Sequence, residues 1–377
     1  MQGGILVELG KQGCPTTSRA GLLETVREHQ EEIRKLPNQT AIEGLERTNA
    51  PWDLATHAGE YLRFRKLGRQ VSKIVRACKN ALPETVKDIL RDSRGLNWLR
   101  SRITASKLAG SSKRLDLCSA QLAHVFHLSG GLTVKDCVCV ELGSGWVLSH
   151  ALVFHLLGAK RVIASDIECL ARPSTLYKAL HSSVASIIRD VLSPFEDHGD
   201  IRARLNDLLA VKRFSFELLR ELGVEYVAPI DLARRSLGIG FDFAYSNSVL
   251  EHVPADDVLP LLENLSKDLS PGGRMIHCVH LEDHKDLVNA PFEFLHEPDE
   301  KYGRDVQTRR GNRMRRSHWQ KVLSLVEGMD FEILYEWRRR DRPPPSIIDS
   351  SVLHVDDEDL TTSHIGILGR RAHDARR

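Results

Sequence analysis

The sequence predicts an α/β protein with a doubly wound, mostly parallel sheet, and three observations support this fold class. From about residue 115 onward, short β-branched or aromatic runs alternate with helical segments, which is typical of a parallel sheet with helices on both faces. The last two strand-like runs have no helix between them, which indicates an antiparallel pair at the edge of the sheet. The hydrophobic content of 41% and the charged content of 28% are ordinary for a chain that buries a core.

Seven runs have the length and composition of strands. In chain order they are "CVCVEL" (137–142), "KRVIASDI" (160–167), "VEYVAPIDL" (224–232), "FDFAYSNS" (241–248), "RMIHCVHL" (274–281), "FEILYEW" (331–337) and "HIGILGRR" (364–371). Helices are expected at "SHALVFHLLGA" (149–159), "ADDVLPLLENLSKDL" (255–269) and "SHWQKVLSLVEGM" (317–329). The segment 338–360 is predicted to be a long polar loop.

The N-terminal part of the chain has a different pattern. Residues 20–105 carry dense charge, with apolar positions at helical spacing and prolines that separate the segments. We therefore expect a helical N-terminal appendage over residues 1–110 and the α/β domain over residues 111–377. Within that domain, residues 300–345 form an arginine-rich insertion and loop.

Charge and cysteine usage exclude several classes of protein. The chain has 53 basic and 51 acidic residues, a net charge of +2, so it is not built to coat nucleic acid or an anionic membrane. Its seven cysteines are an odd number without a C-x-x-C pair, which favours reduced thiols and a cytoplasmic protein. No window reaches the roughly 18 consecutive apolar residues of a membrane span.

A glycine turn follows the first predicted strand, in "ELGSGW". Glycines at 143 and 145 let the backbone approach a ligand closely and leave helix N-terminal N–H groups free to bind it. The dinucleotide fingerprint needs a third glycine, and Leu148 stands there instead. Glu141, beside the turn, would repel a pyrophosphate but would favour a cationic or hydroxyl-rich ligand. The ligand is therefore not expected to be a dinucleotide.

Two further acids stand at the ends of predicted strands. Asp166 ends the second strand, where a carboxylate can accept hydrogen bonds from both hydroxyls of a ribose. Asp231 follows the third strand, where it could reach an adenine amino group. Together with Glu141, these acids describe a pocket for an adenosine that carries a positive centre.

In this order and spacing, "VELGSG", "SDIE", "FDFAYSNSVLEHV" and "LSPGG" resemble the signatures of class I S-adenosylmethionine-dependent methyltransferases. The resemblance covers residues 118–370, and it implies a seven-stranded, mostly parallel sheet with an antiparallel edge strand. It also implies S-adenosyl-L-methionine as the cofactor. By position, the implied cofactor-binding residues are Glu141, Gly143, Ser144 and Gly145 for methionine and ribose, Asp166 for ribose, Asp231 for adenine, and Asn247 near the methionine moiety or the methyl group.

The sequence after the fourth strand bears on the methyl acceptor. Enzymes that methylate exocyclic amines of nucleic-acid bases usually carry an N/D-P-P-Y/F block there, and this chain has "NSVLEH". "SVLEHV" resembles the small-molecule branch of the family, in which His252 would face the acceptor and take its proton. We interpret Glu251 as a carboxylate at a helix start. The combination of "ELGSGW", "LEDH" and "NRMR" also resembles methyltransferases from bacterial glycan gene neighbourhoods.

A histidine-rich segment, "HCVHLEDHKDL", follows the fifth strand. Strand alternation places His277 and His280 on opposite faces, so the cluster is not expected to converge on an ion, and no metal site is predicted. Asp283 and His284 lie beyond the carboxyl end of the strand and are candidate acid and base groups.

The arginine-rich segment "RRGNRMRRSHWQ" has two interpretations. One is a lid in which Asn312, Arg313 and Arg315 grip an anionic or sugar-bearing acceptor, because guanidinium groups suit phosphates and carboxylates. The other is a solvated basic face.

The functional hypothesis is methyl transfer from S-adenosylmethionine to an oxygen, in preference to a nitrogen, of a small-molecule or glycan-like acceptor. Three alternatives stay open: a nicotinamide-dependent oxidoreductase, a non-catalytic S-adenosylmethionine-binding module, and an RNA methyltransferase. The near-neutral charge argues against a nucleic-acid partner.

Overall fold

A seven-stranded sheet in the order β3-β2-β1-β4-β5-β7-β6 is the centre of the fold. The computed structural model describes residues 114–183 and 185–372, so the predicted helical appendage over residues 1–110 lies outside the described residues. The strands are β1 Val138–Leu142, β2 Arg161–Ser165, β3 Val224–Val227, β4 Phe241–Asn247, β5 Leu269–His280, β6 Met329–Arg338 and β7 Thr362–Arg371.

The predicted fold class is confirmed. Strands β1 to β5 pair in parallel, and β7 runs antiparallel to both of its neighbours, β5 and β6. The predicted antiparallel pair of β6 and β7 is therefore present, with β6 as the edge strand and β7 one place inside it. This mixed, seven-stranded sheet is the class I methyltransferase arrangement.

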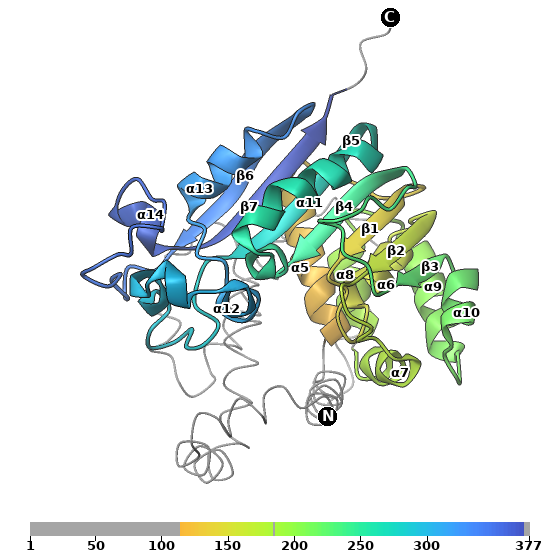
Figure 1. Cartoon of the computed structure of the whole chain (residues 1–377). Helices are drawn as coiled ribbons and strands as arrows, with labels where there is room; N and C mark the ends of the chain where they lie inside the picture. The colour runs from red at the N-terminus through yellow and green to blue at the C-terminus, as the bar shows by residue number, and fades with distance from the viewer. Residues whose placement is uncertain (1–113, 184, 373–377) are drawn as a thin grey trace, which may run out of the picture.

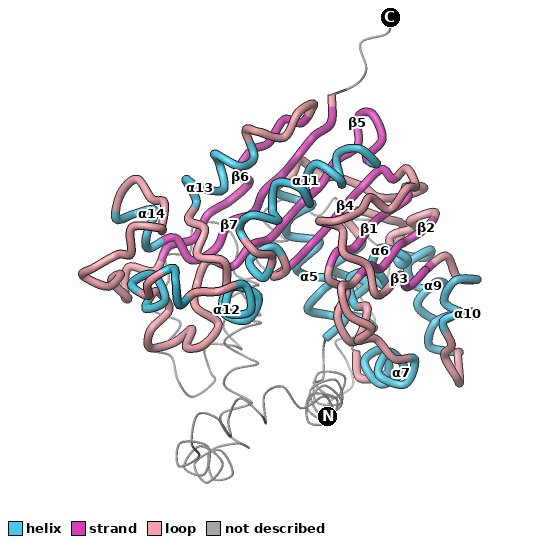
Figure 2. The backbone as a smooth tube through the Cα atoms, in the orientation of Figure 1, coloured by secondary structure: helices cyan, strands magenta, loops and turns pink. Residues whose placement is uncertain are grey.

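Helices cover both faces of the sheet (Figures 1 and 2). The α-helices are α5 Arg114–Leu128, α6 Ser149–Leu156, α7 Pro173–His181, α8 Ala185–Leu192, α9 His198–Ala210, α10 Phe216–Glu221, α11 Ala255–Asp268, α12 Arg304–Arg310, α13 Arg316–Leu323 and α14 Asp357–Thr361. Short 3-10 helices are η2 Leu250–His252, η3 Glu293–His296 and η4 Asp299–Lys301. Within the described residues, no helix combines the length and apolar character needed to cross a membrane.

Each face of the sheet has its own apolar core. On one face, Phe243 of β4 makes edge-to-face contacts with Phe126 of α5 and Phe154 of α6. On the other face, Ala244, the next residue of β4, packs in a core with helices α11 and α13, including the fully buried Trp319. Burial on both faces is the reason why the parallel strands are near-continuous apolar runs in the sequence.

The structure adds elements that the sequence analysis left unassigned. Between β2 and β3 the chain forms the four helices α7 to α10, and the predicted polar loop 338–360 ends in the short helix α14. Helix α13 ends at Leu323, six residues before the end of the predicted helical segment 317–329. The five cysteines in the described part of the chain are all free thiols.

Candidate functional site

The candidate site lies at the carboxyl ends of β1, β2 and β4. Strand β1 pairs with β2 on one side and with β4 on the other, and Leu142 of β1 is in register with Ser165 and Ser246. The loops that follow these three strands therefore leave the sheet at the same level. From β1 the strand order proceeds in opposite directions, and such a switch point is where open α/β sheets bind ligands.

The turn after β1 is tightly constrained. Gly143, Gly145 and Leu148 have left-handed φ angles of 64°, 62° and 49°. A Cβ on Gly143 would lie 2.4 Å from the Val249 side chain, so the turn after β1 packs directly on the loop after β4. Within 4 Å of a Cβ on Gly145, the described residues place only the Gly143 carbonyl oxygen, at 4.0 Å. Gly143 thus serves the packing of two loops, while the space in front of Gly145 is open.

Asp166 joins the glycine turn to the end of β2. Its Oδ2 accepts a hydrogen bond from the Gly145 N–H at 2.8 Å, and its Oδ1 accepts one from the Glu168 N–H at 3.0 Å. Burial raises the pKa of Asp166, while these two N–H groups act in the opposite direction. The adjacent Ile167 is 64% exposed, so an apolar surface lies beside the acid.

Ser144 presents a buried hydroxyl that a bound ligand could use. Its backbone N–H donates to the Ser165 carbonyl at 3.0 Å, which fixes the turn on β2. Its hydroxyl is buried and, among the described residues, has no hydrogen-bond partner. Buried hydroxyls normally have a partner, and a polar ligand beside the turn would supply one.

Glu141 is held from the side of α6. Its Oε2 accepts a hydrogen bond from the Ala151 N–H at 3.0 Å, and its Oε1 is 3.3 Å from Nδ1 of His150. The other ring nitrogen of His150 is 3.1 Å from Gln121 of α5. Burial opposes the protonated form of His150, but the neighbouring Cys118 and Glu141 favour it, and its pKa is raised to about 9. The carboxylate therefore anchors the start of α6 behind the glycine turn.

Asp231 and Asn247 lie on either side of this centre. The Ile230 N–H donates to the Asp166 carbonyl at 2.8 Å, which brings Asp231 next to the end of β2. Asp231 accepts the Ala233 N–H at 3.0 Å through Oδ1. Asn247 ends β4 and is half-buried.

Two histidines meet beyond the ends of β4 and β5. The rings of His252, in η2, and His284 are 4.6 Å apart and nearly perpendicular. Ligand atoms of Glu251, His252 and His284 all lie within 4.8 Å of one another. Burial lowers the pKa of His252, against a smaller effect of the Thr308 backbone.

Asn312 organises the turn that carries His252. Its side-chain amide donates to the carbonyls of Leu250 and Val253, at 3.0 and 2.9 Å, and so spans the turn. The Asn312 N–H donates to the carbonyl of Glu251 at 2.8 Å. The residue predicted to bind the acceptor is thus directly bonded to the backbone around His252.

Asp283 forms an ion pair. Its two oxygens accept hydrogen bonds from Nε and Nη2 of Arg310, at 3.0 and 2.5 Å, and Oδ1 also accepts the Lys285 N–H at 2.9 Å. Arg310 also reaches Glu297 at 2.6 Å. The structure therefore brings Asp283 close to His284 in the chain but directs its carboxylate to Arg310.

The two other predicted acceptor-binding residues hold segments of the chain together. Arg315 is fully buried and donates to backbone carbonyls, among them that of Leu281 at 2.6 Å. Arg313 donates to the Glu297 carbonyl at 2.5 Å and to Asp299 at 2.7 Å, and its guanidinium lies 4.1 Å from the centre of the Tyr302 ring. These donors stabilise the region between β5 and α13.

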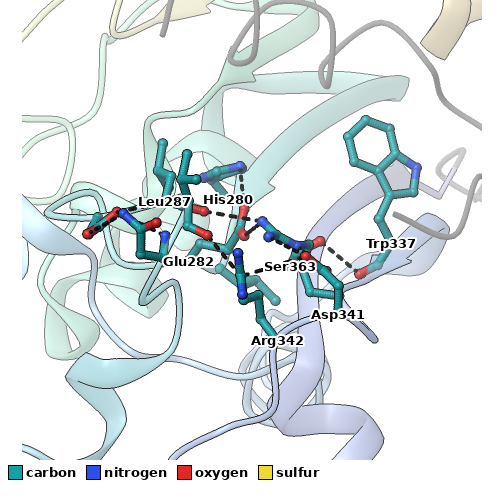
Figure 3. Close-up of polar contacts among 12 residues, drawn as sticks. His280, Glu282, Leu287, Trp337, Asp341, Arg342 and Ser363 are labelled. Carbon is teal, nitrogen blue, oxygen red and sulfur yellow. Dashed lines mark hydrogen bonds and ion pairs between the residues drawn. The ribbon is translucent and has the colours of Figure 1, made fainter. Parts of the chain in front are cut away.

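A buried polar network continues from the histidines toward β6 (Figure 3). His280 contacts His284, with Nδ1 and Nε2 at 3.3 Å, and its other nitrogen is 3.2 Å from Glu282. Glu282 accepts a hydrogen bond from Arg339 at 2.9 Å, and Arg339 also forms a two-point pair with Asp341. Burial raises the pKa of Glu282 to about 7, against the effect of Arg339.

Two contacts of this site were not predicted from the sequence: that of Glu251 with His284, and that of His150 with Glu141. Glu251 lies in the first turn of η2, as predicted, and its Oε1 is also 3.8 Å from Nε2 of His284; its adjacency to His252 was a usable signal for that contact. No local pattern in the sequence indicates the contact of His150 with Glu141, because it depends on how the start of α6 packs against β1. His277 hydrogen-bonds to Ser246 at 2.8 Å, away from His280, as strand alternation predicts.

The raised pKa of His150 generates a prediction for stability. Its folded pKa of about 9 exceeds the unfolded value near 6.5, so the stabilisation is complete below pH 6.5 and is lost as the pH rises through 9. The free energy of unfolding should fall by up to about 3 kcal/mol over this interval. Denaturant unfolding from pH 6 to pH 10 measures this decrease in the free energy of unfolding. The substitution His150→Gln should remove the part of the decrease that comes from His150.

His155, also on α6, provides the matched control. Burial lowers its pKa, so its contribution changes only below pH 6.5, and His155→Gln should keep the decline above that pH. An identical decline in wild type and His150→Gln would contradict the assignment to His150.

No family model and no curated protein matches the chain. Among solved structures, the YcgJ protein from Bacillus subtilis is 14% identical, with 68% of this chain and 98% of that chain covered and a TM-score of 0.37. The mitomycin 7-O-methyltransferase MmcR is 15% identical, with 76% of this chain and 60% of that chain covered and a TM-score of 0.36. The magnesium protoporphyrin IX methyltransferase ChlM from Synechocystis PCC 6803, with bound SAH, is also 15% identical, with 76% of this chain and 99% of that chain covered and a TM-score of 0.35. All three similarities are at low sequence identity.

Proposed function

We propose that the protein is an S-adenosylmethionine-dependent methyltransferase that acts on an oxygen, in preference to a nitrogen, of a small-molecule or glycan-like acceptor. The observation that carries the proposal is the glycine turn bonded to Asp166. The turn leaves space in front of Gly145, and a buried acid stands at its edge. This combination suits a nucleoside whose ribose hydroxyls bond to a carboxylate.

The residues present fit this cofactor. Asp166 uses each oxygen for one backbone N–H, and each oxygen keeps a lone pair for a ribose hydroxyl. Ile167 offers an exposed apolar side chain beside that position. The Ser144 hydroxyl is available for a polar group, and the open space at Gly145 allows close approach. The acids in and around the turn favour a cation.

When bound, S-adenosylmethionine supplies an electrophilic methyl group for transfer to a nucleophilic oxygen. The chain's own part is to place the acceptor beside that group. Val249 touches the glycine turn, and His252 follows three residues later, with His284 against its ring. The two imidazoles are therefore suited to bind the acceptor hydroxyl and receive its proton. Asn312 positions His252, and Asp283 positions Arg310.

The arginine-rich segment supports a small acceptor over a nucleic acid. Arg310, Arg313 and Arg315 are engaged with acids or carbonyls of this chain. Phosphate backbones are bound by cationic groups that are free to replace counterions. The nicotinamide alternative is also less well supported, because the third-glycine position is the fully buried Leu148, whose backbone is already committed to the start of α6.

Asp166 provides the test of the cofactor. S-adenosylhomocysteine should bind the wild-type protein in a calorimetric titration, and Asp166→Asn should weaken it by about 10- to 100-fold because a charged acceptor of ribose hydrogen bonds is lost. Asp242→Asn is the matched control. Asp242 also accepts a hydrogen bond from a backbone N–H, that of Val138 at 2.9 Å, but it lies at the opposite end of the strands. Binding of NAD in place of S-adenosylhomocysteine would reject the proposal.

The two glycines of the turn provide a second test. Both have positive φ, so alanine adds backbone strain of about 1 kcal/mol at either position. Gly143→Ala must also displace Val249 and should lower the unfolding midpoint. Gly145→Ala should lower the unfolding midpoint less than Gly143→Ala does. It should weaken the binding of S-adenosylhomocysteine, because the added methyl group enters the space in front of the turn. Equal effects of both substitutions on stability and affinity would contradict this division of roles.

The acceptor side is tested with methyl-labelled S-adenosylmethionine and a panel of hydroxylated glycans and small molecules. With any acceptor found, His252→Ala should lower turnover at least tenfold while S-adenosylhomocysteine affinity stays within about twofold. His181→Ala, an exposed histidine on α7, should leave both unchanged. Full turnover by His252→Ala would remove His252 from the reaction.

A further inference from the structure

We propose that Glu251, His252 and His284 form a binding site for a first-row divalent cation such as Zn²⁺. Two imidazoles and one carboxylate are a common ligand set for such ions. The three side chains come from two segments, η2 and the loop after β5, that are more than 30 positions apart in the chain.

The geometry is close to that of a ligand set. One ligand atom from each residue lies within 4.8 Å of the other two, and Oε1 of Glu251 is 3.8 Å from Nε2 of His284. Ligand atoms about 2 Å from a tetrahedral ion are separated by roughly 3.3 Å. Small side-chain rotations therefore suffice to bring all three onto one ion.

The environment favours a cation at this point. The Glu251 side chain is only 1% exposed, and a carboxylate held in such a place is stabilised by a positive charge beside it. Nδ1 of His252 is buried, and it has no hydrogen-bond partner within residues 114–183 and 185–372. A metal ion would give the His252 nitrogen a partner and place a positive charge beside the Glu251 carboxylate.

Neighbouring groups hold these ligands in place. Asn312 fixes the turn around His252 through its side-chain amide. Partners of this kind orient metal-binding side chains. His280 lies 3.3 Å from Nε2 of His284, and its other nitrogen contacts Glu282. An ion bound through Nε2 of His284 would replace the His280 contact and leave Nδ1 of His280 beside it.

Nitrogen and carboxylate ligands favour zinc, iron or manganese over magnesium or calcium. Three protein ligands also leave a coordination position open, which would take the acceptor oxygen. With the ion bound, the two imidazoles would act on the acceptor through the ion and not as direct proton acceptors. That role rests on the proposed function, whereas ion binding itself does not.

The test uses the full chain without an affinity tag, after removal of metals with a chelator. Calorimetry with Zn²⁺ should detect one tight site, and Co²⁺ should give the visible absorption bands of a low-coordinate nitrogen and oxygen site. Glu251→Gln, His252→Gln and His284→Gln should each weaken Zn²⁺ by at least tenfold and reduce the Co²⁺ bands. The exposed His181→Gln is the control and should behave as wild type. Millimolar Mg²⁺ should not displace Zn²⁺.

The proposal is overturned if the wild-type protein binds no Zn²⁺, or if the three variants retain wild-type affinity because the ion is bound elsewhere. Circular dichroism and thermal unfolding confirm that each variant is folded. If Glu251→Gln does not fold, the half-buried His252 carries the test. A parallel S-adenosylhomocysteine titration of the wild-type protein separates the two hypotheses, because absence of Zn²⁺ binding together with intact nucleoside binding rejects only the metal site.

Discussion

The contact between the turn after β1 and the loop after β4 is the constraint on which the arrangement of the site depends. Gly143 has no side chain, and Val249 occupies the space where one would be. The same two strands are neighbours in the sheet, so their loops leave it side by side. One loop carries the groups suited to a nucleoside, and the other carries His252. A single close approach of two backbones therefore sets the relation between the two halves of the site.

Buried charge explains much of the architecture around this centre. Arg315 is enclosed completely, and Arg339 lies between Glu282 and Asp341. Charged groups in a low-dielectric interior are costly unless their hydrogen bonds are satisfied, and here carboxylates and backbone carbonyls satisfy them. The region from β5 to α13 is thus held by arginines rather than by an apolar core alone. Arginines of the basic segment thus form hydrogen bonds within the protein, and Arg315 is fully buried.

The fold itself does not determine the chemistry, since the same sheet architecture supports many activities. What distinguishes this chain is the chemistry of its loops: an acid with two backbone donors, a glycine with space before it, and two imidazoles in contact. The nucleoside side is built on rigid strand ends. The part of the site with His252 and His284 depends on the hydrogen bonds of Asn312 to the turn around His252 and on the polar network that begins at His280.

The sequence by itself determined the strands, the α/β class and the position of the glycine turn, because apolar periodicity and turn residues act over a few residues. It also separated His277 from His280 correctly, since strand alternation is local. It did not reveal helices α7 to α10, nor the function of the arginines. Whether Arg315 faces solvent or lies in the interior, and whether Glu251 meets His284, depends on segments tens of residues apart. Only the tertiary structure decided these points, because long-range packing has no periodic signature in the chain.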